Sequence, residues 1–565
     1  MKLYRKLIIA LIFILAVHGP AFSEKFIPMQ PIIKASKLKP GLTGYVLTVL
    51  KGTKPSKLPV KIISVVPQRP GRTVTSEILI KFTGGHELSK GMSGSPVYIN
   101  GRLAGAVRSG WDLSDHSLAM VTPIESMCRI FDYDSDSDPH KNFLAGDLTL
   151  SGMNKTPALQ RLADSLGLGL VQGVSSSSGE LKISRETLRP GDAVSAVLVW
   201  GDVELSAAGT VTATSHDGRF IAFGHSFMKR GTANFPAAKT FVHDTVGSVS
   251  FPFKLTSPLA INGTITQDRE SGIGGMFGYY APSIAGRFIF KDLDSNTTQN
   301  FNFRVVADEF FTQTLLEGIF TGLAEEAWDR KGQGTMMITT HVDGRNIPGW
   351  SRQDIFYESE NIIAKAFAQT IEIINALLTQ PFNSVMPLGF TVTVEASRKP
   401  RVLMIQDVKV PESASPGEDI EIIVTLRGWR TKPITRKFVM KIPEDASGVC
   451  EVIVRGGSVQ PMSQTSVDEG WKSINSLSRM LKEIKALDAN NELIIELNAD
   501  KLTNALKEVL SNNNHNQQKL LTDEQEEYLS ETKTRRIREG DLKILRSEYF
   551  IDGMQKRVIR ISESE

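Results

Sequence analysis

Residues 91–101 read Gly-Met-Ser-Gly-Ser-Pro-Val-Tyr-Ile-Asn-Gly, which predicts a glycine-rich turn, a short strand and a hairpin turn in direct succession. The strand covers Val97 to Ile99, and a second apolar segment, Leu103 to Val107, follows the Asn100-Gly101 pair. Because both central positions of a type I′ turn need positive φ, Asn-Gly is a strong hairpin signal. This part of the chain therefore predicts a β fold built from short strands.

Similar strand patterns lie on both sides of this segment. They cover Val60–Val66 and Ile78–Phe82 before it, and Val194–Val199, Glu204–Thr212 and Phe220–Phe223 after it, with Asp217-Gly218 as a second hairpin turn. The sequence thus predicts two β-rich blocks, residues 24–135 and 181–310. Residues 136–180 begin with a polar, charged stretch and are expected to form a linker region.

The remaining sequence changes its pattern twice. Apolar residues recur at helical spacing over 315–327 and 362–377, which predicts an α/β segment over 311–400. Alternating apolar residues over 420–426 and 438–442 predict a small β-sandwich at 401–460, and 461–565 are expected to be a helical and β C-terminal region. The expected fold class is mainly β with α/β additions.

The N-terminal residues have the pattern of an export signal. Lys2, Arg5 and Lys6 precede the apolar run Leu7–Val17, and Ala21-Phe22-Ser23 ends the segment with small residues where a signal peptidase cuts. Residues 1–23 are therefore predicted to be a cleaved signal peptide, the alternative being an uncleaved N-terminal anchor. No later segment reaches 18 consecutive apolar residues, so we expect no transmembrane segment after signal removal and a location in the periplasm, the cell envelope or the extracellular space.

Composition excludes several classes of function. The 565 residues correspond to between three and four domains at about 150 residues each. The formal net charge of +3, from 65 basic and 62 acidic residues, is too small for a polycation that binds nucleic acid. Two distant cysteines, Cys128 and Cys450, support neither a disulfide scaffold nor a zinc ribbon, and no H-E-x-x-H motif is present. We expect no metal and no cofactor, and we expect Cys128 to be a buried, small apolar residue.

Ser93 is the strongest candidate for a catalytic residue. Flanking glycines let the backbone fold so that the N–H groups of Gly91 and Ser93 point at one spot, the geometry that an oxyanion hole requires. A serine also needs a base, and His225, at the end of the apolar strand Ile221-Ala222-Phe223, is the best-placed histidine. The alternatives are a glycine-rich turn without chemistry and a hydrogen-bonded core histidine.

Three segments resemble the SpoIVB family of sporulation serine peptidases. They are Gly91–Val97 with the following hairpin, Gly209–Thr212 with Phe223-Gly224-His225, and Gly263–Thr266 with Ser271–Gly275. The resemblance implies a trypsin-like double β-barrel peptidase in which Ser93 is the nucleophile and His225 the general base. In that family the histidine block precedes the serine block, so the two halves are permuted here, and a triad tolerates any chain order.

The third member of a triad does not map onto this sequence. The family's aspartate has no counterpart at Ile78–Thr83, which leaves Glu77, Glu87 and Asp244 as candidate acids. Two functions follow as hypotheses: an exported serine endopeptidase acting on a protein or peptide substrate, or a catalytically inactive peptidase-fold protein that binds an envelope partner or serves as a scaffold. For the first, the loop from Ser109 to His116, including Trp111, is expected to form the specificity pocket.

Overall fold

The computed structural model describes residues 25–68, 74, 76–132, 147–174, 181–444, 446–458, 475–498 and 542–562. The predicted signal peptide, residues 1–23, lies outside the described residues. The chain forms two compact units, Met1–Ser283 with Phe303–Asp308, and Ile284–Asn302 with Glu309–Glu565. The protein is mainly β, as expected, with few helices.

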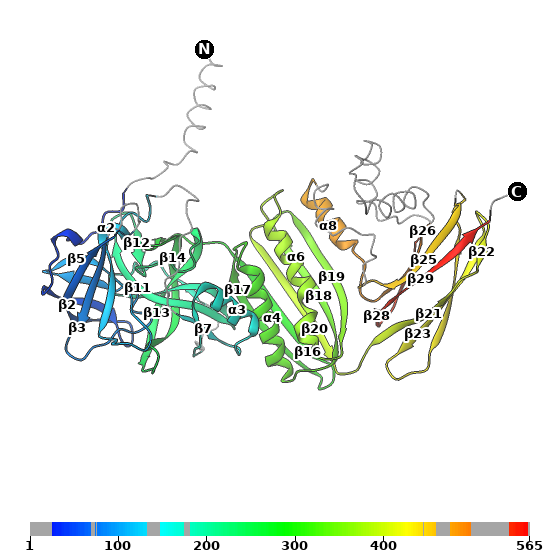
Figure 1. Ribbon diagram of the computed structural model, residues 1–565, viewed down its shortest axis with the longest axis horizontal. Coiled ribbons are helices and arrows are strands. Elements are labelled where there is room, and N and C mark those ends of the chain that lie inside the picture. Colours follow the sequence, from blue (N-terminus) through cyan, green and yellow to red (C-terminus); the bar gives the residue numbers. More distant parts are fainter. Residues whose placement is uncertain are drawn as a thin grey trace, which may run out of the picture. The chain divides into compact units, whose positions relative to one another are not determined.

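The first unit begins with a closed antiparallel barrel of six strands (Figure 1). In order around the barrel these are β1 (Thr43–Val49), β2 (Pro55–Pro67), β3 (Ser76–Phe82), β6 (Leu118–Pro123), β5 (Arg102–Ser109) and β4 (Pro96–Ile99). Its interior is apolar and includes Val46, Ile62, Ile80, Val97 and Val107. The short elements η1 (Ala35–Lys37) and α2 (Ile124–Met127) flank the barrel in sequence.

A second ring of strand pairings follows in the same unit. Its strands are β10 (Ala193–Gly201), β13 (Gly231–Val246), β14 (Phe253–Arg269), β15 (Gly272–Phe277), β12 (Arg219–Ala222) and β11 (Glu204–Thr214). All of these pairs are antiparallel, and β11 pairs in turn with β10, so the pairing returns to its starting strand. Both β-rich blocks of the sequence therefore form strands as predicted.

The stretch expected to be a linker contains regular structure. Of residues 136–180, the described part holds β7 (Asp147–Ser151), α3 (Pro157–Leu166) and β8 (Gly169–Gln172). β7 pairs with β11 and with β8, which extends the sheet beyond the second ring. β9 (Lys182–Ile183) pairs with β14, and the end of β17 (Thr297–Val306) pairs with β10.

Both predicted hairpin turns are confirmed. Asn100 and Gly101 join β4 to β5 with φ of 50° and 74°, the positive values that the type I′ prediction required. Gly218, with φ of 86°, lies between β11 and β12.

The second unit contains the predicted α/β segment. β18 (Gly334–Gly344) pairs with β19 (Ile347–Glu358) and β20 (Leu388–Ser397), and β20 runs parallel to β16 (Ser283–Asp292). Figure 1 shows α4 (Thr312–Trp328) and α6 (Ala368–Thr379) lying across this sheet. Ile362–Thr379 is long and apolar enough to cross a membrane, but it comprises α5 (Ile362–Ala366) and α6, and half of it is buried in the protein. A core helix accounts for its composition.

The second unit also contains a two-sheet β module. One sheet holds β24 (Ile434–Lys441), β23 (Asp419–Gly428), β21 (Val402–Lys409) and β28 (Phe550–Asp552), and the other β22 (Ser413–Ala414), β29 (Met554–Ile561), β25 (Gly448–Gly456), β26 (Glu492–Asn498) and β27 (Leu542–Arg546). One apolar core joins residues from Ile405 to Ile561. The module thus extends well beyond the expected 401–460, because strands near the C-terminus complete both sheets. The helix α8 (Leu477–Lys485) precedes β26.

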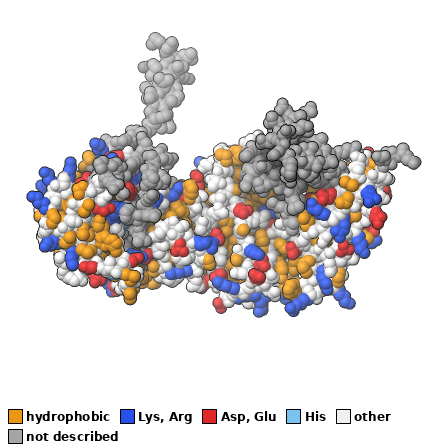
Figure 2. Space-filling model, viewed as in Figure 1, with side chains coloured by type: hydrophobic (Ala, Val, Ile, Leu, Met, Phe, Trp, Pro, Cys, Tyr) orange, Lys and Arg blue, Asp and Glu red, His pale blue; other side chains and the backbone are white. Residues whose placement is uncertain are grey.

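Charged side chains of both signs are interspersed over the face shown in Figure 2. This distribution agrees with the near balance of 65 basic and 62 acidic residues. No single-sign patch dominates that face.

Candidate active site

The Ser93 turn precedes β4 and is tightly hydrogen bonded. Met92 N–H donates to the Ser89 carbonyl at 3.0 Å, and Ser95 N–H donates to the Met92 carbonyl at 2.9 Å. Gly91 and Gly94 have φ of 90° and 87°, the left-handed region that favours glycine. The two glycines on either side of Ser93 thus allow the turn to form without strain.

Two amides of this turn differ from their neighbours. The N–H groups of Lys90, Met92, Gly94 and Ser95 all donate to backbone carbonyls. By contrast, the N–H groups of Gly91 and Ser93 have no acceptor among the described residues. The sequence pattern predicted these same two amides as an oxyanion hole, which needs N–H groups that remain free to bind the substrate oxygen.

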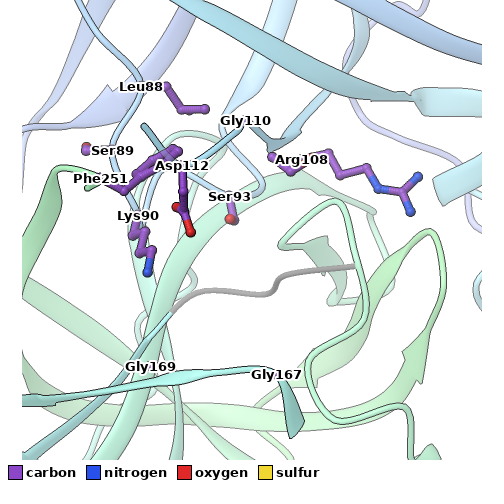
Figure 3. A pocket seen from close by; sticks show the side chains of 11 residues that line it. Leu88, Ser89, Lys90, Ser93, Arg108, Gly110, Asp112, Gly167, Gly169 and Phe251 are labelled. Atoms are coloured by element: carbon purple, nitrogen blue, oxygen red, sulfur yellow. The ribbon is translucent and has the colours of Figure 1, made fainter. Parts of the chain in front are cut away.

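Ser93 is half-buried and lines a pocket. The other residues that line it are Leu88, Ser89, Lys90, Arg108, Ser109, Gly110, Asp112, Gly167, Gly169 and Phe251. Figure 3 shows the Ser93 hydroxyl between the side chains of Asp112 and Lys90 on one side and Arg108 on the other. Lys90 also forms an ion pair with Asp147 at 3.0 Å. The expected pocket loop does contribute Ser109, Gly110 and Asp112, whereas Trp111 is 47% exposed and is not among the lining residues.

The segment that carries His225 packs directly on the Ser93 turn. Thr210 N–H, on β11, donates to the Ser93 carbonyl at 2.8 Å, and Thr212 Oγ1 donates to the Gly94 carbonyl at 2.7 Å. A Cβ atom at Gly94 would lie 2.2 Å from the Thr210 carbonyl oxygen and 2.3 Å from the Phe223 nitrogen. The structure therefore brings together two sequence segments more than a hundred residues apart.

The chain turns sharply just before His225. Phe223 and Gly224 both have φ of 68°, and a positive φ is a strained conformation for a bulky residue such as phenylalanine. Such strained backbone is concentrated at functional sites. Thr122 Oγ1, on β6 of the first barrel, donates to the Gly224 carbonyl and helps to hold this conformation.

The His225 ring is buried, with 2% of the residue exposed. Its Nδ1 donates to the Ser226 carbonyl oxygen at 2.7 Å, so the lone pair of the neutral ring lies on Nε2. Nε2 is buried without a hydrogen-bond partner among the described residues, so it makes no hydrogen bond to Ser93 here. Burial, with a smaller contribution from the nearby Arg108 guanidinium, lowers the pKa of His225 to about 4, against the opposing effect of the Ser226 bond. The ring is therefore neutral at pH 7, as a general base must be.

None of the three candidate acids hydrogen bonds to the His225 ring. Glu77 lies on β3, opposite Val66, and Glu87 lies in the loop before the Ser93 turn. Asp244 is on the surface of β13, where it pairs with Lys51 at 2.9 Å, and this bond lowers the pKa of its carboxyl group. At Nδ1 the Ser226 carbonyl occupies the place that an acid would take in a triad.

The buried carboxylate near His225 is instead Asp268. It accepts hydrogen bonds from the N–H groups of Phe227 and Met228, both at 2.7 Å, and of Arg230 at 3.1 Å. Burial raises the pKa of Asp268, and these backbone donors oppose that effect. Asp268 therefore fixes the loop that follows His225.

The described residues contain no group of three or more His, Cys, Asp or Glu side chains that could hold a metal. Neither Cys128 nor Cys450 forms a disulfide bond, and Cys128 is partly buried, close to the expectation. Burial raises the pKa of the Cys128 thiol to about 12, so it stays protonated and unreactive near neutral pH.

No pattern in the sequence indicated that Arg108, Asp268 or Lys254 belongs to this region. Lys254, on β14, is 5% exposed, and a single lysine in a strand is ordinarily taken as a surface residue. The alternation Phe253-Lys254-Leu255-Thr256 suggests that the two apolar residues face inward, whereas the structure buries Lys254 and Thr256. No family model, curated protein or solved structure matches this chain.

Proposed function

We propose that the protein is a serine endopeptidase in which Ser93 attacks the substrate carbonyl. The observation that carries this proposal is the pair of amides, Gly91 and Ser93, that have no acceptor beside a half-buried hydroxyl on a pocket. Amides that are held in place and left free stabilise a developing oxyanion without reorganisation.

The architecture supports the same proposal. Two successive six-strand rings of antiparallel pairings agree with a trypsin-like double β-barrel, and the serine and histidine segments come one from each ring. The three segments that resemble the SpoIVB family fall on the Ser93 turn, on β11 and β12 with the turn after them, and on β14 and β15. The serine-bearing ring comes first in the chain, which is the permuted order.

In the proposed mechanism His225 acts as the general base. Nε2 takes the proton from Ser93 Oγ while Oγ bonds to the carbonyl carbon, and the proton then passes to the leaving amine as the peptide bond breaks. Water hydrolyses the acyl-enzyme by the same steps. The Ser226 carbonyl holds the ring in the required tautomer. Because the ring is buried beside Arg108, the imidazolium is disfavoured, and we expect a slow enzyme that needs the substrate to bring Ser93 and His225 together.

Labelling with a fluorophosphonate tests this proposal. We expect the purified protein without residues 1–23 to be labelled, and Ser93→Ala and His225→Ala to lose labelling almost completely. Ser56→Ala is the control, because Ser56 is an exposed serine on β2 that does not line the pocket, and it should leave labelling unchanged. Equal labelling of wild type and Ser93→Ala would refute the assignment of Ser93.

The alternative is a catalytically inactive envelope protein that uses this fold to bind a protein partner. Among the residues that the structure describes, no carboxylate hydrogen bonds to the His225 ring and Ser93 makes no hydrogen bond to it, and both observations favour this alternative. Absence of labelling in every variant, together with binding of a peptide that Ser93→Trp blocks, would support this second function.

We also propose that the protein is exported to the periplasm or cell envelope. The support is the pattern of residues 1–23. Expression of the full chain followed by N-terminal sequencing tests it, and a mature chain that still starts at Met1 would contradict cleavage.

A further inference from the structure

We infer that Lys254 is a positioning residue that orients both peptide groups flanking Gly91 and so aims the Gly91 N–H at the oxyanion. The inference rests on the proposed function and adds a residue to its site. Lys254 lies at the start of β14, in the second strand ring, whereas Gly91 belongs to the turn that precedes β4 of the first.

The backbone of Lys254 fixes the first of these peptide groups. Lys254 N–H donates to the Lys90 carbonyl at 3.0 Å, and Lys90 N–H donates to the Pro252 carbonyl at 2.8 Å. In a trans peptide the C=O and the following N–H point in opposite directions. Since the Lys90 carbonyl points at Lys254, the Gly91 N–H points away from it and stays free.

The side chain of Lys254 fixes the second peptide group. Its Nζ donates to the Gly91 carbonyl at 3.1 Å and to Thr48 Oγ1 at 2.9 Å. A Cβ atom at Gly91 would lie 3.2 Å from Lys254 Cδ, so the aliphatic part of the side chain also covers this glycine. Gly91 can otherwise rotate more freely than any other residue type. Thr210 Oγ1 also donates to the Gly91 carbonyl, at a longer 3.4 Å, and the Met92 N–H is bonded to Ser89. Lys254 makes the shorter bond to this carbonyl and so contributes most to limiting the freedom that would let the oxyanion donor turn away.

The environment of Lys254 is unusual for a lysine that serves only packing. No carboxylate lies within ion-pair distance of Nζ in the described part of the chain, and the side chain is buried. Burial lowers the pKa of Lys254 to about 7. A buried amine without a counter-ion costs stability, which a methionine of similar length would not. A role in holding the Gly91 carbonyl accounts for an amine at this position.

Inactivation kinetics with a fluorophosphonate separate positioning from binding. For Lys254→Met we expect the maximal inactivation rate to fall about tenfold to a hundredfold. This decrease is no larger than the one expected when an oxyanion donor is itself removed. The concentration for half-maximal rate should stay within about twofold, because the pocket side chains are unchanged. Lys61→Met, an exposed lysine on β2, should match wild type.

Stability distinguishes this role from a structural one. Lys254→Met should unfold at the same denaturant concentration as wild type or a higher one, so slower inactivation cannot reflect a damaged fold. If Lys254→Met does not fold, Lys254→Gln, whose side chain is one atom shorter, replaces it with the same expectation. A stable variant with the wild-type inactivation rate would overturn the inference and leave the proposed function intact.

A crystal structure of the variant tests the inference independently of activity. We expect the Gly91–Met92 peptide group to rotate once Nζ is removed. If wild type is not labelled at all, the proposed function fails. The inference about Lys254 is then tested by the crystal structure of the variant alone, and an unchanged orientation of the Gly91 carbonyl would refute the inference.

Discussion

His225 combines three features that rarely occur together in a histidine that only fills space. The ring is buried, its Nδ1 is fixed by the Ser226 carbonyl, and its Nε2 has no hydrogen-bond partner among the described residues. A buried polar atom without a partner costs about 1–3 kcal/mol. A substrate-bound geometry in which Ser93 Oγ donates to Nε2 would recover that loss.

The burial of His225 predicts a specific dependence of stability on pH. Its pKa falls from 6.5 to about 4 on folding, so between these values the unfolded state binds a proton that the folded state excludes. The free energy of unfolding should therefore rise as pH increases from 4 to 6.5. Below pH 4 both states bind the proton, and the protein is then less stable than at neutral pH by the full contribution of His225. The effect of this fully buried group is on the order of 3 kcal/mol.

Urea unfolding of wild type and His225→Gln at pH 4.5, 5.5 and 6.5 measures this contribution. The difference in the free energy of unfolding should shift in favour of the variant as pH falls. Ser56→Ala, at an exposed and non-titrating residue of β2, provides the control and should show a constant difference. A constant difference for His225→Gln as well would contradict the protonation behaviour assigned to this ring.

At the level of elements, the close approach of the Ser93 turn to β11 and β12 holds the candidate site together. We expect Gly94→Ala to destabilise the protein by on the order of 3 kcal/mol, because the new Cβ would overlap the Thr210 carbonyl and the Phe223 nitrogen. Gly85→Ala is the matched control. Gly85 also has a positive φ, of 76°, but nothing lies within 4 Å of its Cβ position.

Thermal unfolding and fluorophosphonate labelling of both glycine variants check this expectation. Gly85→Ala should cost about 1 kcal/mol from backbone strain alone and should keep labelling. Gly94→Ala should lose labelling even where it remains folded, since Ser93 moves with Gly94. Equal destabilisation by the two substitutions would show that backbone conformation, and not the contact with β11 and β12, sets the cost.

Local signals in the sequence predicted individual elements well. Asn100-Gly101 specified a hairpin because its chemistry is local, and the spacing over 315–327 predicted α4. The pattern over 362–377 predicted one helix, whereas the structure divides it at Phe367 into α5 and α6. Residues 147–172 looked like part of a linker because β7 and β8 are short and acquire their pairing partners from tertiary structure.

The candidate site was predictable only in part for the same reason. The glycine pattern around Ser93 encodes a turn, so the free amides of Gly91 and Ser93 could be inferred locally. Lys254 and Asp268 act through backbone groups that are distant in sequence, and no local pattern reports such contacts. The absence of a carboxylate at His225 Nδ1 likewise depends on which carbonyl the loop presents, here that of Ser226.

Across the whole molecule, the β module of the second unit depends on residues at the very end of the chain. β28 pairs with β21, and β29 pairs with β25, so strands separated by about a hundred residues or more close both sheets. Ile559 is fully buried opposite Cys450, whereas its neighbour Val558 is 58% exposed. The side chains of β29 thus contribute unequally to one core.

The reactivity of Cys450 measures whether β29 closes this core. In a Cys128→Ala background, Ile559→Ser should destabilise the module by about 2–5 kcal/mol, through lost apolar burial and a buried hydroxyl, and should speed modification of Cys450 by a thiol reagent. Val558→Ser should change stability by about 0.5 kcal/mol or less and leave that rate unchanged. Both variants should keep fluorophosphonate labelling at Ser93, because the candidate site lies entirely in the first unit. Equal rates of Cys450 modification in the two variants would contradict the assigned pairing, because they would show that Ile559 does not cover Cys450 in the core.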